Sequence, residues 1–219
     1  MDRFKELPVK GAVFDFDGTL VDSMYMWKDI DREYLSRHGH EMTPDLQVEI
    51  EGMSQDEMCE YFRTRYRIRQ SNEEMQKEWF DMARCKYLHE VQLKPGMKNL
   101  LSYFKERGIR IAVATSFVKA IVEPCLERLG VLDFFESIVT TDEAGVGKES
   151  PEVFVKAAAA IGVSPAECVA FEDLPIGLLS AKKAGMYTVA VYDRYSEGRE
   201  EMKKESADFF IVSADELLS

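Results

Sequence analysis

The sequence predicts an α/β fold, a doubly wound parallel sheet interrupted after its first strand by an all-helical insert. Three observations predict this fold class. From residue 93 onward, short continuous apolar runs alternate with helical patterns, which is typical of a parallel sheet covered on both faces. One further run, Ala12 to Phe16, lies near the N-terminus and is apolar except for Asp15. Between these two parts, residues 23–92 show helical periodicity and no convincing strand.

The first part of the chain contains one strand and then several helices. The strand is expected over "VKGAVFDFD", residues 9–17. Over residues 23–37, apolar side chains recur every three or four positions, as on one face of a helix: Met24, Trp27, Ile30 and Tyr34. Further helices are expected at 44–49, 54–65 and 72–89. Ser54, followed three residues later by Glu57, indicates a capping box.

Pro95 and Gly96 mark the boundary at which the alternating part begins. A helix is expected at 97–107, then a strand at 110–115 and a helix that contains Pro124, which should kink it. The remaining expected elements are a strand at 137–140, a helix at 151–162, a strand at 168–173, a helix at 177–185, and strands at 187–192 and 208–213. Right-handed crossovers should join these strands into one sheet.

The composition of the chain argues against two classes of binding partner. The net charge of −12 argues against binding to nucleic acid or to an anionic membrane surface. The charged start of the chain lacks the apolar core of a signal peptide, and no window is apolar enough for a membrane span. The four cysteines form no CxxC pair and are expected to be reduced and mostly buried. These features favour a cytoplasmic protein.

Polar side chains gather at the expected carboxyl ends of four strands or in the loops that follow them. They are Asp15, Asp17, Thr115, Ser116, Lys148, Glu172 and Asp173. Each has an ordinary alternative explanation: a hydroxyl such as that of Ser116 often caps a helix, and a loop lysine is usually solvated. Together, however, they converge on the edge where ligands bind in open α/β sheets. Several carboxylates there would repel one another without a cation, and Mg²⁺ prefers such oxygen ligands.

A calcium-binding loop is a competing explanation for the run Asp15-x-Asp17-Gly-Thr. An EF-hand loop needs glycine at its sixth position and glutamate at its twelfth, where this chain has Leu20 and Met26. The run also follows a strand rather than a helix. The calcium interpretation is therefore disfavoured.

With these motifs in order, the chain resembles a haloacid dehalogenase superfamily hydrolase of the subgroup with a helical cap, the β-phosphoglucomutase-like phosphatase group. "DFDGTLVDS" resembles the first motif of that family, "IAVATS" the second, "GKESPEVF" the third and "CVAFEDLPIGLLSAKKAGM" the fourth. The resemblance implies a Rossmann-like catalytic core formed by residues 1–21 and 93–219. It also implies a cap domain formed by residues 22–92.

The resemblance also implies a role for each motif residue. Asp15 would be the nucleophile, and Asp17 the general acid and base. Thr115, Ser116 and Lys148 would bind the phosphoryl oxygens, and Gly18 would allow the sharp turn beside them. The expected Mg²⁺ ligands are Asp15, the main-chain carbonyl of Asp17, and Asp173, with Glu172 nearby or ligating through water.

The chain departs from the family pattern at several positions. Glu149 follows Lys148 where a small residue or proline is common, and Leu174 with Pro175 follows the Glu-Asp pair. Mutase relatives carry a histidine in the first cap helix and an arginine after the cap "G-x-S". This chain has Trp27 and Gln55 there, which are the two candidate substrate-binding residues of the cap.

The expected function is a Mg²⁺-dependent phosphatase that hydrolyses a small phosphorylated metabolite through an aspartyl phosphate, in a monomer or weak homodimer. The alternative is a β-phosphoglucomutase-like phosphosugar mutase, against which Trp27 and Gln55 argue. A metal-independent dehalogenase would usually lack the second aspartate, Asp17. A regulatory protein that kept the fold without the chemistry would not need the full motif set.

Overall fold

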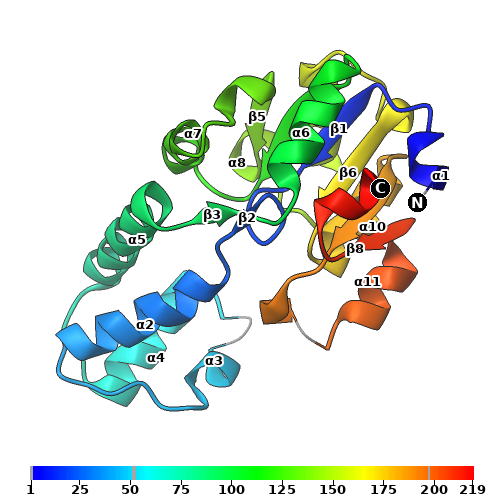
Figure 1. The fold of residues 1–219 in the computed structure, drawn as a ribbon. Helices are drawn as coiled ribbons and strands as arrows, with labels where there is room; N and C mark the ends of the chain where they lie inside the picture. Colours follow the sequence, from blue (N-terminus) through cyan, green and yellow to red (C-terminus); the bar gives the residue numbers. More distant parts are fainter. Residues whose placement is uncertain (1, 51–52, 197) are drawn as a thin grey trace. The chain divides into compact units, whose positions relative to one another are not determined.

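The computed structural model describes residues 2–50, 53–196 and 198–219. Their contacts divide the chain into two compact units (Figure 1). The core unit comprises Met1–Ser23 and Val91–Ser219, and the helical unit comprises Met24–Glu90. The chain thus leaves the core unit after its first strand and returns to it some 67 residues later, counting Met24 to Glu90.

The core unit is built on a six-stranded sheet in which every pairing is parallel, as the alternating sequence predicts. The strand order is β5-β4-β1-β6-β7-β8. The strands are β1 (Gly11–Phe14), β4 (Arg110–Thr115), β5 (Ser137–Thr140), β6 (Cys168–Glu172), β7 (Tyr187–Val191) and β8 (Phe209–Ile211). Because β1 and β6 are central and adjacent, the residues that follow them meet at the carboxyl edge of the sheet.

Helices of the core unit cover both faces of this sheet (Figure 1). They are α1 (Asp2–Lys5), α6 (Met97–Glu106), α7 (Lys119–Arg128), α8 (Thr141–Ala144), α9 (Glu152–Ala160), α10 (Pro175–Lys183) and α11 (Glu200–Ser206). On one face, α9 packs on small side chains such as Ala112 and Ala170. On the other, Phe104 of α6 lies near Phe14 and Phe171, whose rings stack at 4.4 Å. The helix α9 therefore packs on a sheet face of small side chains, and α6 packs on a face of aromatic side chains.

The helical unit contains α2 (Tyr25–Arg37), α3 (Leu46–Glu49), α4 (Gln55–Tyr66) and α5 (Asn72–His89). The expected capping box at Ser54 and Glu57 is present at the start of α4. Ser71 and Glu74 form a second one at the start of α5. The interior of the unit is aromatic: the Tyr34 ring lies 5.7 Å from that of Phe62 and 5.3 Å from that of Trp79.

Several local features differ from the sequence-based expectations. The chain forms a small antiparallel ribbon, β2 (Val21–Asp22) paired with β3 (Gln92–Leu93), where it leaves and re-enters the core unit. Strands of two residues carry too little periodicity to be recognised in a sequence. The short helices α8 and α11 are likewise additions to the expected elements. Ser116 does not cap α7, whose N-cap is Val118.

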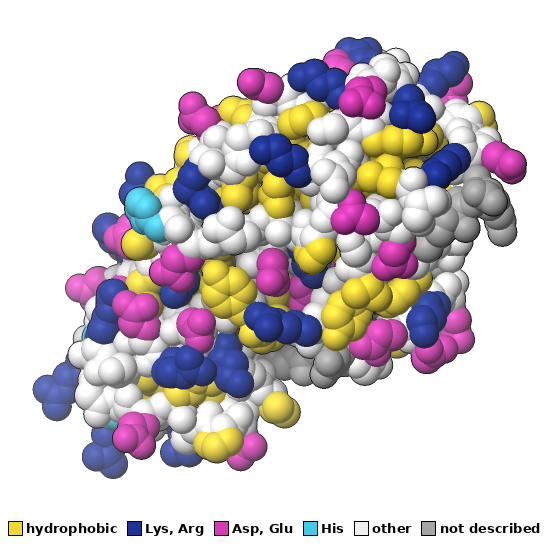
Figure 2. Space-filling model, viewed as in Figure 1, with side chains coloured by type: hydrophobic (Ala, Val, Ile, Leu, Met, Phe, Trp, Pro, Cys, Tyr) yellow, Lys and Arg dark blue, Asp and Glu magenta, His cyan; other side chains and the backbone are white. Residues whose placement is uncertain are grey.

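The acidic composition does not produce a surface of uniform charge. On the face drawn in Figure 2, Lys and Arg side chains are interspersed with Asp and Glu side chains. None of the helices within the described residues has the length and apolar character needed to cross a membrane. Three of the four free cysteines are buried and only Cys85 is exposed, close to the expectation for this chain.

Candidate active site

A tight turn follows β1 and presents the two aspartates of the first motif. The Asp15 amide donates to the Phe171 carbonyl at 2.9 Å, so the first aspartate is still held by the neighbouring strand β6. The chain then reverses: the Gly18 amide donates to the Val21 carbonyl at 3.0 Å. Gly18 has a φ of +73°, a left-handed conformation that glycine adopts without the penalty of a Cβ. The glycine of this motif is thus required by the turn.

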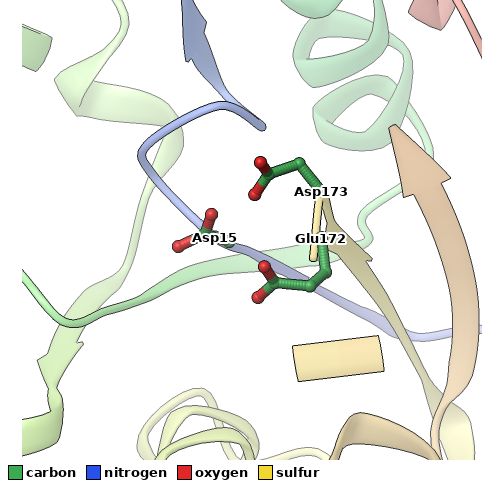
Figure 3. Close-up of side chains that lie close together, drawn as sticks. All are labelled: Asp15, Glu172 and Asp173. Carbon is green, nitrogen blue, oxygen red and sulfur yellow. The ribbon is translucent and has the colours of Figure 1, made fainter. Parts of the chain in front are cut away.

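Asp15, Glu172 and Asp173 form a buried acidic cluster at the carboxyl edge of the sheet (Figure 3). Each offers a carboxylate oxygen, and these oxygens all lie within 4.8 Å of one another. Figure 3 shows the carboxylates of Glu172 and Asp173 turned toward Asp15. The three residues are at most 5% exposed. Because three buried carboxylates this close together repel one another, they require positive charge beside them.

Lys148 supplies part of that positive charge. Its ammonium donates to Glu172 Oε2 at 2.9 Å and to Asp15 Oδ1 at a shorter distance. The lysine side chain is 13% exposed, so the ion pairs are largely shielded from water. The lysine lies in the loop between α8 and α9, far in sequence from both partners, and the fold brings all three together as the motif spacing predicted.

The cluster perturbs the protonation of its own members. Burial and the Asp15 charge raise the pKa of Glu172 to about 7, although Lys148 acts in the opposite direction and lowers it. Burial and the charges of Glu172 and Asp15 also raise the pKa of Asp173. Burial lowers the pKa of Lys148, but its two carboxylate partners outweigh this effect and raise it overall. One ammonium group therefore does not neutralise the site.

Hydrogen bonds fix the orientation of the remaining aspartates. Ser23 Oγ donates to Asp17 Oδ1 at 2.6 Å, which holds the half-buried carboxylate of Asp17 in one rotamer. Thr19 Oγ1 donates to Asp173 Oδ1 at 3.4 Å. Neither Ser23 nor Thr19 was expected to contact these groups. Both stand within the first motif "DFDGTLVDS", and only the turn places their hydroxyls against the carboxylates.

Gly177 was also missed as a site residue. A Cβ at this position of α10 would lie 2.4 Å from both Cδ and Oε2 of Glu172. The Glu172 carboxylate can occupy its place only because this residue has no side chain. Its other oxygen, Oε1, accepts from the Leu174 amide at 3.3 Å. The glycine lies in the "DLPIG" sequence of the fourth motif, but its contact with Glu172 depends on the geometry of α10.

The two hydroxyl residues at the end of β4 differ in their surroundings. Thr115 is buried, and its Oγ1 accepts from the Phe117 amide at 2.9 Å. Ser116 is exposed. β4 is the direct neighbour of β1 in the sheet, so Thr115 ends at the same edge as Asp15.

The two candidate residues of the insert belong to the helical unit. Trp27 lies in α2 and is half-buried. Gln55 is the exposed first residue of α4. Gly52, the glycine of the cap "G-x-S", lies outside the described residues.

The donor set of the core unit fits a small, hard divalent cation. The three clustered carboxylates supply oxygen ligands only, and a single lysine leaves negative charge uncompensated. Mg²⁺ prefers such ligands and needs few of them from protein, because it retains water and binds substrate phosphate oxygens. Asp15, Glu172 and Asp173 could therefore hold the ion.

Comparison with known proteins agrees with this geometry. Residues 12–191 match the family model described as haloacid dehalogenase-like hydrolase. The chain belongs to this family. It is 32% identical to the β-phosphoglucomutase of Bacillus subtilis over 194 residues, covering 84% of this chain and 83% of that protein. It is 30% identical to the fructose-1-phosphate phosphatase YqaB of Escherichia coli, covering 83% of this chain and 95% of that one.

A solved structure agrees at the level of the fold. CbbY from Rhodobacter sphaeroides, crystallised in complex with phosphate, superposes with a TM-score of 0.75 at 23% identity, over 94% of each chain. The family, its phosphatase relatives and the clustered site make this chain a phosphoric monoester hydrolase. The fold class and the family resemblance expected from the sequence are thus confirmed.

Proposed function

We propose that this chain is a Mg²⁺-dependent phosphatase that hydrolyses small phosphorylated sugars through an aspartyl phosphate on Asp15. The observation that carries the proposal is the buried contact of Asp15 with Lys148, next to Glu172 and Asp173. It sets a carboxylate nucleophile beside one ammonium group and two further carboxylates that fit a divalent cation. In this proposal residues 1–21 and 93–219 form the catalytic core, and residues 22–92 form the cap.

In the first step, an Asp15 carboxylate oxygen attacks phosphorus and the bond from phosphorus to the ester oxygen breaks. Asp17, in its protonated form, gives its proton to the departing oxygen, so the sugar leaves as a neutral alcohol. Ser23 supports this role because its 2.6 Å hydrogen bond fixes the Asp17 carboxyl group. The products of this step are the free sugar and an acyl phosphate on Asp15.

In the second step, water attacks the phosphorus of the acyl phosphate. The Asp17 carboxylate now takes a proton from that water, and the phosphorus–oxygen bond to Asp15 breaks. Inorganic phosphate leaves, Asp15 is again a carboxylate and Asp17 is again protonated. The cycle consumes one water and needs no other reactant.

Lys148 and the residues after β4 bind the phosphoryl group in this mechanism. The Lys148 ammonium already contacts Asp15, so it can stabilise the negative charge that develops on the transferred phosphoryl group. Thr115 and Ser116 supply hydroxyl and amide groups at the neighbouring strand end. When bound, Mg²⁺ would neutralise charge between the Asp15 carboxylate and the phosphate and favour their approach.

Relatives support the substrate class. One relative is named for fructose 1-phosphate and another, from Thermotoga maritima, is named as a phosphatase of phosphorylated carbohydrates. The β-phosphoglucomutase of B. subtilis is as similar as these phosphatases, so a mutase is the competing function. Trp27 and Gln55, which stand where mutases carry histidine and arginine, favour hydrolysis.

A screen of the purified chain against hexose and pentose phosphates, nucleotides and phosphorylated small acids tests the proposal. It should be run with Mg²⁺ and after exhaustive chelation. Release of free phosphate from sugar phosphates, lost on chelation and restored by Mg²⁺, is expected. Full turnover without metal would contradict the proposal. Interconversion of hexose 1- and 6-phosphates, dependent on a bisphosphate and faster than phosphate release, would favour the mutase.

A further inference from the structure

The core unit contains a second group of buried charges that the proposed chemistry does not use. Lys203 of α11 is 0% exposed, Asp193 is 1% exposed and Lys94 is 7% exposed. Lys94 Nζ donates to Asp193 Oδ2 at 2.6 Å and to the Tyr192 carbonyl at 2.7 Å. One buried carboxylate thus faces two buried lysines. Burying a second ammonium is costly unless another negative charge is near it.

Among the described residues, neutral acceptors rather than an ion pair hold Lys203. Its ammonium donates to Ser196 Oγ at 2.6 Å and to the Val191 carbonyl at 3.4 Å. Ser196 Oγ in turn donates to the Asp193 carbonyl at 3.0 Å, so it presents a lone pair to the lysine. These bonds hold the ammonium at the carboxyl end of β7.

That end of β7 lies next to the metal site. Ala190 of β7 pairs with Glu172, the last residue of β6, and Val191 and Asp173 are the next residues of the two segments, so both lie at the same end of neighbouring strands. The ammonium at the Val191 carbonyl is therefore on the side of Asp173 away from β1. The electrostatic interactions of Asp173 agree with this placement: Lys203 lowers its pKa, opposing burial and the neighbouring carboxylates.

We propose that Lys203 is a positioning residue whose buried positive charge acts through Asp173. This charge lowers the affinity of the site for the cation and raises its affinity for phosphate. The inference rests on the proposed function. In their ionised forms, Asp15, Glu172 and Asp173 carry three negative charges against the two ammonium groups of Lys148 and Lys203. Without Lys203 the excess negative charge doubles, which strengthens cation binding and repels a phosphate dianion.

This mechanism predicts changes of opposite sign in two affinities. In Lys203→Met, Mg²⁺ should bind about tenfold more tightly, because a buried positive charge near Asp173 is removed. Inorganic phosphate, measured at saturating Mg²⁺, should bind about tenfold more weakly for the same reason. A purely structural role for Lys203 would loosen the site and weaken both.

The experiment is isothermal titration calorimetry of the full chain with Mg²⁺ alone, and then with inorganic phosphate in the presence of Mg²⁺. Lys94→Met is the matched control: it also removes a buried lysine, but the Lys94 ammonium donates to Asp193 and to the Tyr192 carbonyl rather than to the Val191 carbonyl at the end of β7. Its two affinities should stay within about twofold of the wild type, well inside the tenfold change expected of Lys203. Lys203→Gln keeps a donor for Ser196 without the charge, and should reproduce the opposite shifts if Lys203→Met does not fold.

Parallel weakening of both ligands, no change in either, or equal shifts in Lys94→Met would overturn the inference. So would loss of folded protein in both Lys203 variants, since it would assign the lysine to stability alone. A wild-type chain that binds no Mg²⁺ and hydrolyses no phosphate ester would instead refute the proposed function. The two failures are therefore distinguishable.

Discussion

Replacing Gly177 with alanine should damage the site while leaving the fold intact. The new Cβ would lie 2.4 Å from the Glu172 carboxyl carbon, whereas ordinary van der Waals contact begins at 3.4 Å. The carboxylate must therefore retreat by about 1 Å, the difference between these two distances. Its contact with Lys148 is 2.9 Å long, so a displacement of that size disturbs this hydrogen bond.

The expected costs differ for stability and activity. Alanine is favoured over glycine inside a helix by about 1 kcal/mol, which offsets part of the strain of about 1–3 kcal/mol from overpacking. The melting temperature should change by only a few degrees. A misplacement of about 1 Å at a catalytic centre can cost about 10²-fold in rate, and kcat/KM should fall by that order.

A double-mutant cycle with Glu172→Ala provides the assay. Phosphatase activity and melting temperature are measured for Gly177→Ala, Glu172→Ala and the double variant. With alanine at 172 the clash disappears, so Gly177→Ala should then cost almost no further activity. An equal loss from Gly177→Ala in both backgrounds, or unchanged activity in the single variant, would show that Gly177 does not act through Glu172.

Three further predictions concern single residues. Burial raises the pKa of Asp31 to about 6 from 3.8, so its stabilising contribution is complete below about pH 4 and is lost as pH rises through about 6. Urea unfolding should show Asp31→Asn more stable than wild type at neutral pH by up to about 3 kcal/mol, with no gain at acid pH; an unchanged pH dependence would contradict this. Lys148→Met should lower kcat/KM by at least about 10²-fold on any phosphate ester, since it loses stabilisation of developing charge; activity near wild type would exclude Lys148 from the site. Trp27→Ala should change the ranking of sugar phosphates and raise KM while turnover of p-nitrophenyl phosphate persists, and an unaltered ranking would return Trp27 to a packing role.

The parallel sheet and the site at its edge were predictable because both leave local signals. Each central strand is a continuous apolar run, and Asp15, Lys148 and Glu172 each follow such a run or its loop. The topology of parallel sheets then brings strand ends together without further information. For the same reason the family could be recognised from four short motifs in order.

The contacts that tune the site were not predictable, because they join residues that look ordinary in the sequence. Lys203 stands beside Lys204 in a charged segment, yet one is fully buried and the other exposed. Gly177 lies in a helix with an ordinary helical backbone, and only the position of Glu172 explains it. Such contacts depend on the angle at which α10 and α11 pack on the sheet.

The proposed mechanism requires a covalent acyl phosphate on Asp15, which should accumulate in the variant Asp17→Asn. The amide introduced by this substitution would supply neither the acid nor the base, but p-nitrophenolate needs no proton to leave, so the first step should proceed and the second should stall. Mixing this variant with p-nitrophenyl phosphate and Mg²⁺ should release about one p-nitrophenolate per protein. After acid quenching, borohydride reduction and mass spectrometry should find homoserine at position 15. Steady turnover without a burst and with Asp15 unmodified would exclude a covalent intermediate on Asp15.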